Sequence, residues 1–153
     1  MSKGIRIRLQ NPTERGRLYP RYDEEADVLE VGSSVQRDWL YGVDIDGNVV
    51  FDLDSDRVLA NFDLLVPKYL WKVTESAGRW SSPSQEADLQ FHRETLKHKS
   101  FHLPLEVTTD EKRSLVSIRF GEVNQQARVI ILSESCLALV EADHLLGFLL
   151  KLL

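Results

Sequence analysis

The sequence has few of the residues that mark disulfide-bonded, metal-binding or membrane-spanning proteins. Cys136 is the one cysteine among 153 residues, so neither an internal disulfide nor a cysteine-based zinc site can form, and a reducing cytoplasm is the expected location. Residues 1–6 lack the apolar core of a secretory signal, so we expect none. The longest apolar run, Leu145–Leu153, is much shorter than the about 20 residues that a membrane-spanning helix requires.

Basic charge is scarce outside the N-terminal segment. The chain has 19 Lys and Arg residues against 24 Asp and Glu residues, a net charge of −5. Residues 1–21 are basic, with Glu14 as their one acidic residue, so the remainder is more acidic than the total suggests. An acidic body opposes general nucleic-acid binding and favours a basic protein partner.

Motifs of catalysis and cofactor binding are also missing. The sequence has no Gly-x-Ser-x-Gly elbow, no phosphate-binding loop and no dinucleotide-binding glycine pattern. Cys136 has no histidine placed nearby to activate it, and a small buried thiol is the ordinary interpretation. We therefore predict no catalytic residue and no cofactor. The absence of motifs does not exclude an enzyme, because the residues of most catalytic sites are scattered along the sequence.

One pattern is present twice. Residues Tyr22–Val31 and Thr109–Ile118 each have an acidic residue pair followed by alternating apolar residues. Asp23 corresponds to Asp110 at an offset of 87 residues, and the last residues of the two segments have the same offset. A fixed offset between similar segments indicates duplicated units.

The pattern of apolar residues predicts an α+β fold of two similar halves. Each half is expected to be a small antiparallel, meander-like sheet followed by a helix, and a linker helix joins them. The expected boundaries are an N-terminal strand and basic segment over residues 1–17, a first repeat over 18–73, a linker with a surface helix over 74–100 and a diverged repeat over 101–153.

Local signals place the helices and one hairpin. Ser82-Pro83-Ser84-Gln85 is a capping-box arrangement that predicts a helix to about Lys99. Asp143 is an expected N-cap for a final, almost wholly apolar helix. Asp46-Gly47-Asn48 predicts a hairpin turn between strands in residues 36–45 and 49–53, because these residues tolerate positive φ angles.

The first repeat resembles a small bacterial domain-of-unknown-function family, family 2283, whose members open with Tyr-Asp-x-Glu-x-Asp-x-Leu-Tyr-Ile. The corresponding segment is Tyr22-Asp23-Glu24-Glu25-Ala26-Asp27-Val28-Leu29-Glu30-Val31. The family's closing pattern, Asp-x-Asp-Gly-x-x-x-Gly-Ile-Glu-Ile-Leu, matches residues 54–65, with Arg57 and Asn61 at its two glycines. The resemblance implies an antiparallel sheet followed by a helix, and it brings no activity or catalytic residues.

The second repeat looks like a more diverged member of the same family. It keeps Asp110 and the alternating apolar residues that follow. Matching Asp63 to Asp143 gives an offset of 80, which predicts a shorter hairpin region in this copy.

Two groups of residues could bind metal, and each has a simpler interpretation. Carboxylates and an amide recur at Asp44, Asp46, Asn48, Asp52, Asp54 and Asp56, as in a calcium loop. An EF-hand loop has glycine at its sixth position and glutamate at its twelfth, and the sequence has neither when the loop is counted from Asp44 or from Asp52. Turn formation is therefore favoured. His92, His98 and His102 could form a transition-metal site, but a spacing of six puts the first two on opposed helix faces. We predict no metal site.

Aromatic and apolar residues provide the candidate contacts with partners. Trp80 lies in a polar stretch, and Trp39 and Tyr41 lie near a strand end, so these three are candidate partner contacts. The final helix would require cover for its apolar surface, either between the halves or in a homodimer. The candidate oligomer interface is Leu145, Phe148, Leu149 and Leu152.

These observations favour a non-catalytic binding or regulatory protein that acts through protein–protein contacts, such as an antitoxin or an immunity protein. The alternative is an enzyme or small-ligand binder with an acidic pocket between the two halves. No membrane association is expected.

Overall fold

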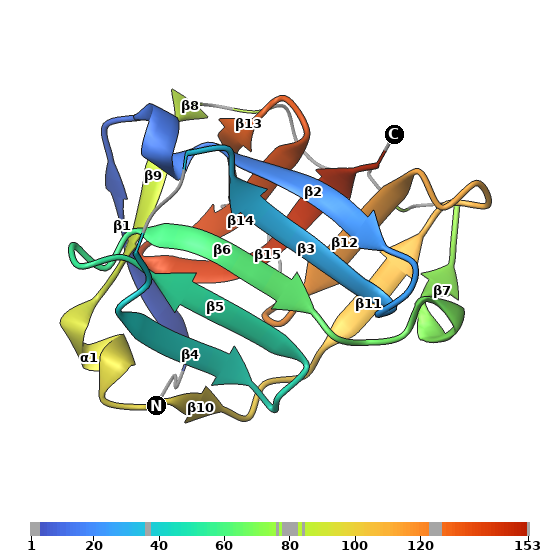
Figure 1. The fold of residues 1–153 in the computed structure, drawn as a ribbon, viewed down its shortest axis with the longest axis horizontal. Helices are drawn as coiled ribbons and strands as arrows, with labels where there is room; N and C mark the ends of the chain where they lie inside the picture. Colours follow the sequence, from blue (N-terminus) through green and yellow to red (C-terminus); the bar gives the residue numbers. More distant parts are fainter. Residues whose placement is uncertain are drawn as a thin grey trace.

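The chain folds into two β-sheets that pack face to face (Figure 1). This computed structural model describes residues 4–35, 38–75, 77, 83, 85–122 and 127–152. Strands dominate these residues, and the one α-helix among them, α1 (Arg93–Leu96), has four residues. The predicted α+β class is therefore wrong. None of the helices described is long and apolar enough to cross a membrane.

The first sheet has six strands in the order β10-β4-β5-β6-β3-β2. All neighbouring pairs are antiparallel except β10 with β4. The strands are β2 (Leu18–Asp23), β3 (Val28–Ser33), β4 (Tyr41–Ile45), β5 (Val49–Leu53), β6 (Leu59–Leu64) and β10 (Ser100–Phe101). The hairpin predicted around Asp46 and Gly47 joins β4 to β5, and both residues have positive φ angles of 50° and 72°.

The second sheet has nine strands, seven of them in the order β7-β11-β12-β15-β14-β13-β8. Strand β1 pairs with one end of β15 and then with β9, so these two strands extend the sheet along one side of the sandwich. The strands are β1 (Ile5–Gln10), β7 (Lys72–Val73), β8 (Gln85–Glu86), β9 (Asp88–Phe91), β11 (Glu106–Thr109), β12 (Leu115–Arg119), β13 (Arg128–Ser133), β14 (Cys136–Glu141) and β15 (His144–Lys151). Two short 3-10 turns complete the fold, η1 (Glu14–Gly16) and η2 (Lys68–Leu70).

The C-terminal segment is a strand, and the predicted helix from Asp143 is wrong. Strand β15 lies between β12 and β14 in the middle of the second sheet. Phe148 and Leu150 point into the core, whereas Leu149 lies on the other face among further apolar residues. A strand with both faces apolar has no polar alternation, so its sequence cannot be distinguished from that of a buried helix by periodicity alone.

The linker helix predicted to run to about Lys99 is also wrong. Residues 85–91 form β8 and β9, and only Arg93–Leu96 are α-helical. Ala87, Leu89 and Phe91 are all buried, at the alternate spacing of a strand. Two residues of the capping-box sequence, Ser82 and Ser84, lie outside the described residues.

The two halves share one strand topology. The first sheet contains the path β2-β3-β6-β5-β4, and the second contains β11-β12-β15-β14-β13. In each path the first two strands of the unit in chain order are followed by the fifth, the fourth and the third. Every neighbouring pair in both paths is antiparallel. An equal strand order is what duplication of a five-stranded unit requires.

The registers of the two halves agree as well. Strand β6 has one extra residue, Ala60, opposite β5, and β15 has one extra residue, Leu146, opposite β14. Such β-bulges are specific features of a strand pair. Phe62 and Phe148 then occupy equivalent positions at an offset of 86, so the offset of 80 predicted from Asp63 and Asp143 is wrong.

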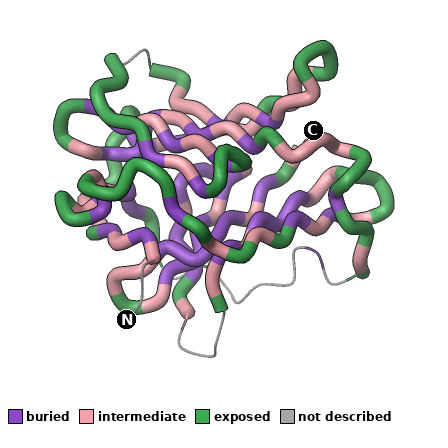
Figure 2. The backbone as a smooth tube through the Cα atoms, turned by 90° about the horizontal axis from the view of Figure 1, so that it is seen from below, coloured by how far each residue is buried: buried purple, intermediate pink, exposed green. Residues whose placement is uncertain are grey.

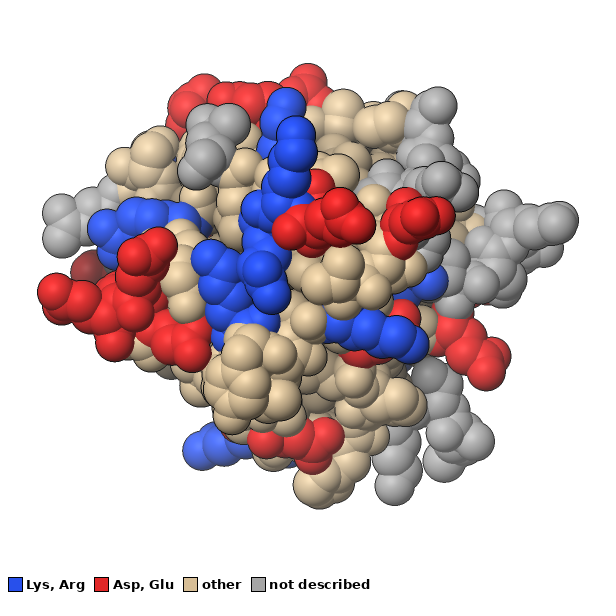
Figure 3. Space-filling model, turned by 90° about the vertical axis from the view of Figure 1, so that its right-hand side faces the viewer, with Lys and Arg blue, Asp and Glu red and all other residues tan. Residues whose placement is uncertain are grey.

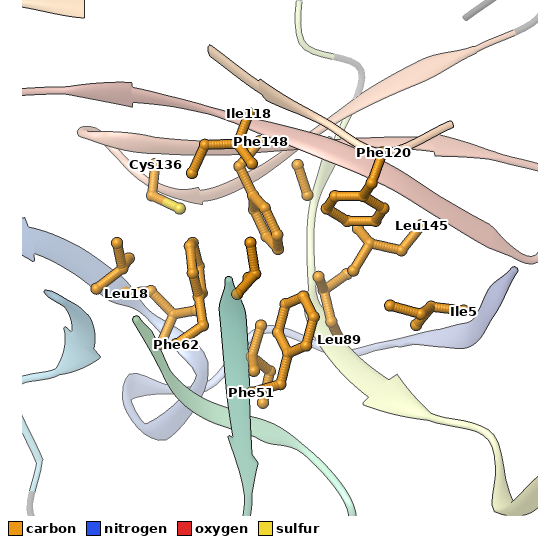
Figure 4. Close-up of a cluster of buried hydrophobic side chains, with 14 of the residues drawn as sticks. Ile5, Leu18, Phe51, Phe62, Leu89, Ile118, Phe120, Cys136, Leu145 and Phe148 are labelled. Atoms are coloured by element: carbon orange, nitrogen blue, oxygen red, sulfur yellow. The ribbon is translucent and has the colours of Figure 1, made fainter. Parts of the chain in front are cut away.

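The core lies between the sheets and is built around aromatic rings (Figure 4). The rings of Phe62 and Phe148 stack with centroids 4.2 Å apart and an interplanar angle of 25°. Phe51 contacts both of them and also Phe91 and Phe120. Buried residues follow the strands, whereas exposed residues gather at the turns (Figure 2). The two equivalent units are thus joined by one continuous apolar core.

Candidate functional site

Carboxylates gather on the side of the first sheet that faces away from the second sheet. Along β5 and β6, residues alternate between the core and this side. We call this side the outer acidic face. It consists of Glu30, Asp44, Val50, Asp52, Asn61 and Asp63, all half-buried.

The strand register arranges these residues in two rows across the sheet. In the first row Asp63 lies opposite both Glu30 and Val50, and Val50 lies opposite Asp44. In the second row Asn61 lies opposite Asp52. Directly opposed residues on one face are in side-chain contact range, so the four carboxylates form one patch.

Asn61 joins the two central carboxylates. Its side-chain amide donates to Asp52 Oδ2 at 3.2 Å and to Asp63 Oδ1 at 3.4 Å. Burial raises the pKa of both carboxyl groups above the ordinary value, and the hydrogen bonds from Asn61 oppose this rise. Neither carboxylate forms an ion pair with a described residue, whereas Glu30 is paired with Arg21 at 2.7 Å. Asp52 and Asp63 are therefore two neighbouring negative charges that Asn61 bonds and that no described cation neutralises.

A hollow of about 670 Å³ adjoins the second row, between Asn61 and Trp39. Gly32 lines it, and a Cβ atom on Gly32 would lie 2.7 Å from Asn61 Oδ1. A side chain at position 32 would therefore displace the amide that holds the two carboxylates.

Four exposed apolar residues between the end of β3 and the start of β4 form what we call the apolar rim, and two of them, Val35 and Trp39, line the hollow. The rim consists of Val35, Trp39, Leu40 and Tyr41, which are exposed by 39%, 58%, 62% and 38% respectively. Leu40 is anchored by its backbone N–H, which donates to the carbonyl of Leu53 at 2.8 Å. Large exposed apolar residues grouped beside a polar patch are typical of a protein-binding surface.

The structure places the sequence-predicted contact residues in different environments. Trp39 and Tyr41 are both exposed, and of the two only Trp39 lines the hollow, whereas Trp80 lies outside the described residues. Of the candidate oligomer interface, Leu145 and Phe148 are buried in the core of the chain itself, and Leu149 and Leu152 are half-buried.

The residues considered as metal ligands are occupied in local structure. Asp54 is buried, and its Oδ1 accepts the backbone N–H groups of Asp56 and Val58, both at 2.9 Å. Asp44 Oδ1 accepts from the backbone N–H of Gly47 at 3.0 Å and from the hydroxyl of Ser100 at 2.7 Å.

The histidines are dispersed. His92 Nδ1 accepts the backbone N–H of Glu94 at 3.4 Å, His98 lies against Phe101, and His102 contacts Asp46. Within the described part of the chain, no three His, Cys, Asp or Glu side chains are grouped as metal ligands. Cys136 is fully buried in the core, and burial raises the pKa of its thiol.

Sequence reasoning missed the role of Glu30, Asn61 and Asp63. The signal was available, because Asp52 on β5 and both Asn61 and Asp63 on β6 alternate with buried residues. Polar residues at every second position of neighbouring strands share one face. From the sequence, Asp52 is instead assigned to turn formation, together with Asp44, Asp46, Asn48, Asp54 and Asp56.

Comparison with known proteins gives no match, since neither a protein-family model nor a curated protein sequence is similar to this chain at a significant level.

Proposed function

We propose that this protein is a non-catalytic binding module that docks a basic protein partner on the outer acidic face and the apolar rim. An antitoxin-like or immunity-like role in the cytoplasm is the concrete form of this proposal. The observation that supports it is that Asn61, which bonds the half-buried carboxylates of Asp52 and Asp63, lines the same hollow as the exposed Trp39.

Each part of this surface would supply a different component of binding. Opposite charge steers association and fixes the orientation of the partner, whereas desolvated aromatic side chains provide most of the affinity. Lys or Arg side chains of the partner would meet Asp52 and Asp63, and apolar side chains would cover Trp39. A carboxylate that is partly desolvated before binding loses less hydration when the partner arrives.

The alternatives considered from sequence have less support. The space between the sheets is filled by the aromatic core, so we do not propose an acidic pocket between the halves. A homodimer through the C-terminal helix is not proposed, because β15 is a central strand.

The test is co-expression of this chain with each gene that adjoins its own gene, followed by co-purification and cross-linking mass spectrometry. We expect one basic protein to co-purify in a defined stoichiometry, with cross-links near β4 and the apolar rim. The double variant Asp52→Asn/Asp63→Asn and the variant Trp39→Ala should each weaken the complex at least tenfold. Tyr69→Ala is the matched control, because Tyr69 is 78% exposed and lies on η2.

Two results would contradict the proposal. One is a partner that binds the wild type and all the variants equally. The other is a set of cross-links confined to the second sheet.

A further inference from the structure

A second candidate site lies where the edge strand β2 meets the turns of the second sheet. It is a groove of about 600 Å³ that both equivalent units line. Its cationic residues are Arg21, Lys68, Lys112, Arg113 and Lys151. Figure 3 shows this end of the molecule, where Lys and Arg side chains form a band with Asp and Glu beside it. We call it the basic groove.

One wall of the basic groove is held by a network around Asp27. The Tyr22 hydroxyl donates to Asp27 Oδ1, which also accepts the backbone N–H of Lys68 at 3.1 Å. The Lys68 ammonium lies 4.5 Å from the centre of the Tyr22 ring, a cation–π contact. Lys68 is therefore positioned by both its backbone and its side chain.

The opposite wall is the turn between β11 and β12, which Asp110 holds. Its carboxylate accepts from the backbone N–H of Ser114 at 2.7 Å, from the Ser114 hydroxyl at 2.6 Å and from the backbone N–H of Leu115 at 3.1 Å. These bonds lower the pKa of Asp110, the largest contribution coming from the Ser114 hydroxyl, so the carboxylate remains ionised and the turn stays closed.

Arg113 occupies a strained position in this turn. Its φ angle is 53°, a region that favours glycine. Arg57 has a similar φ of 65°, but its side chain has a structural task, because Nε donates to the carbonyl of Phe91 at 3.1 Å. The guanidinium of Arg113 makes no such bond to a described residue. Positive φ angles recur at other turns of the described chain, such as Ala142 at 52°, so the angle itself is turn geometry. What distinguishes Arg113 is a guanidinium that lines the groove without such a bond to a described residue.

The end of β15 connects the two turns that border the groove. The backbone N–H of Lys151 donates to the carbonyl of Ser135 at 2.9 Å, and that of Leu152 donates to the carbonyl of Ser114 at 2.7 Å. Lys151 is thereby fixed between the β11–β12 turn and the β13–β14 turn. Among the described residues, neither Lys151 nor Lys112 has an ion-pair partner.

We propose that the basic groove binds a compact oligophosphate anion, either as free oligophosphate or as the phosphate chain of a nucleotide. Cations on both walls suit a ligand with several negative groups, and Arg and Lys are the usual phosphate-binding side chains. Glu24 and Glu134 border the groove. These carboxylates limit the positive region to the groove and would repel a long polyanion, so the ligand is compact. The basic groove adjoins the outer acidic face at one point, the 2.7 Å ion pair between Arg21 and Glu30, so the cations left for the ligand are Lys68, Lys112, Arg113 and Lys151.

The test is isothermal titration calorimetry with tripolyphosphate at low ionic strength. Arg113→Gly and Lys151→Gln should each weaken binding about tenfold, the loss of one charge-assisted contact. Glycine suits the backbone conformation at position 113, so a loss of binding in Arg113→Gly cannot be attributed to unfolding. Lys97→Gln is the matched control on α1, where Lys97 pairs with Glu94 at 3.3 Å, and it should leave binding unchanged.

Parallel titrations separate the sources of the phosphate chain. Tighter binding of ATP without a metal ion would identify a nucleotide, whereas equal binding of ATP and tripolyphosphate would identify the phosphate chain as the recognised group. The proposal is overturned if neither binds below about millimolar concentration, or if Lys97→Gln weakens binding as much as Lys151→Gln. It is also overturned if a single-stranded RNA 20-mer binds more tightly through the same residues.

Discussion

Alanine substitutions along β15 test the strand that forms where the sequence predicts a helix. Phe148 and Leu150 are fully buried, whereas Leu149 between them is half-buried on the outer side. Replacing Phe148 with alanine should lower the free energy of unfolding by about 3–5 kcal/mol, and replacing Leu150 by about 2–5 kcal/mol. Leu149→Ala should cost only about 1 kcal/mol, because the half-buried Leu149 side chain has roughly half the buried apolar area of a fully buried leucine. Urea denaturation monitored by circular dichroism measures all three.

The Phe62–Phe148 stack adds a second magnitude to the same series. Because the rings lie 4.2 Å apart, the double variant Phe62→Ala/Phe148→Ala should be less destabilised than the sum of the single variants by about 0.5–1.5 kcal/mol. A Leu149→Ala cost as large as that of Phe148→Ala would refute the alternation of β15. A coupling energy of zero would refute the stack across the two equivalent units.

Three further predictions concern two glycines, the carboxylates of Asp52 and Asp63, and the buried Asp54. Gly147→Ala would put a Cβ atom 2.2 Å from the carbonyl oxygen of Ile118, so it should cost about 3 kcal/mol in urea denaturation, whereas Gly47→Ala, with φ of +72° and open space, should cost about 1 kcal/mol. Burial raises the pKa values of Asp52 and Asp63, so the folded state binds these protons more tightly than the unfolded state, and stability falls as pH rises from about 3.8 through the raised folded values. The double variant Asp52→Asn/Asp63→Asn should therefore melt at a higher temperature than the wild type at pH 7, and the difference should vanish below about pH 3.8. A difference in melting temperature that stays constant between these pH values would count against burial as the cause. Asp54→Ala leaves two backbone N–H groups without their acceptor and should cost about 1–3 kcal/mol, and calcium should stabilise neither this variant nor the wild type in thermal melts.

The sequence was informative where local chemistry determines local structure. The hairpin at Asp46-Gly47 and the strand Ile5–Gln10 follow from turn residues and from apolar alternation. The offset of 87 between Asp23 and Asp110 also pointed to units whose strand order proves to be equal.

The errors arose where tertiary context decides the structure. An apolar run such as Leu145–Leu150 suits a buried helix or a central strand equally, and only its neighbours β12 and β14 determine which one forms. In the linker, the capping-box pattern favours a helix, whereas the alternation of Ala87, Leu89 and Phe91 favours a strand. The strand forms because Leu89 and Phe91 pair with β1 and all three side chains are buried.

The candidate sites could be predicted only in part. Trp39 and Tyr41 are predicted from sequence as contact residues, but the hollow that Trp39 shares with Asn61, the partner of Asp52 and Asp63, forms only when the strands pair. The basic groove could not be predicted, because its cations are far apart in the sequence. Lys68 and Lys151, for example, are separated by more than 80 residues and come together only when the two sheets pack.

The central claim is that the outer acidic face binds a basic protein. The most direct measurement is the dissociation constant of the co-purified partner, by calorimetry, for the wild type and for Asp52→Asn/Asp63→Asn at two salt concentrations. We expect weaker binding of the double variant and a smaller salt dependence, because two charges that attract the partner have been removed. Equal dissociation constants and equal salt dependence for the two proteins would contradict it.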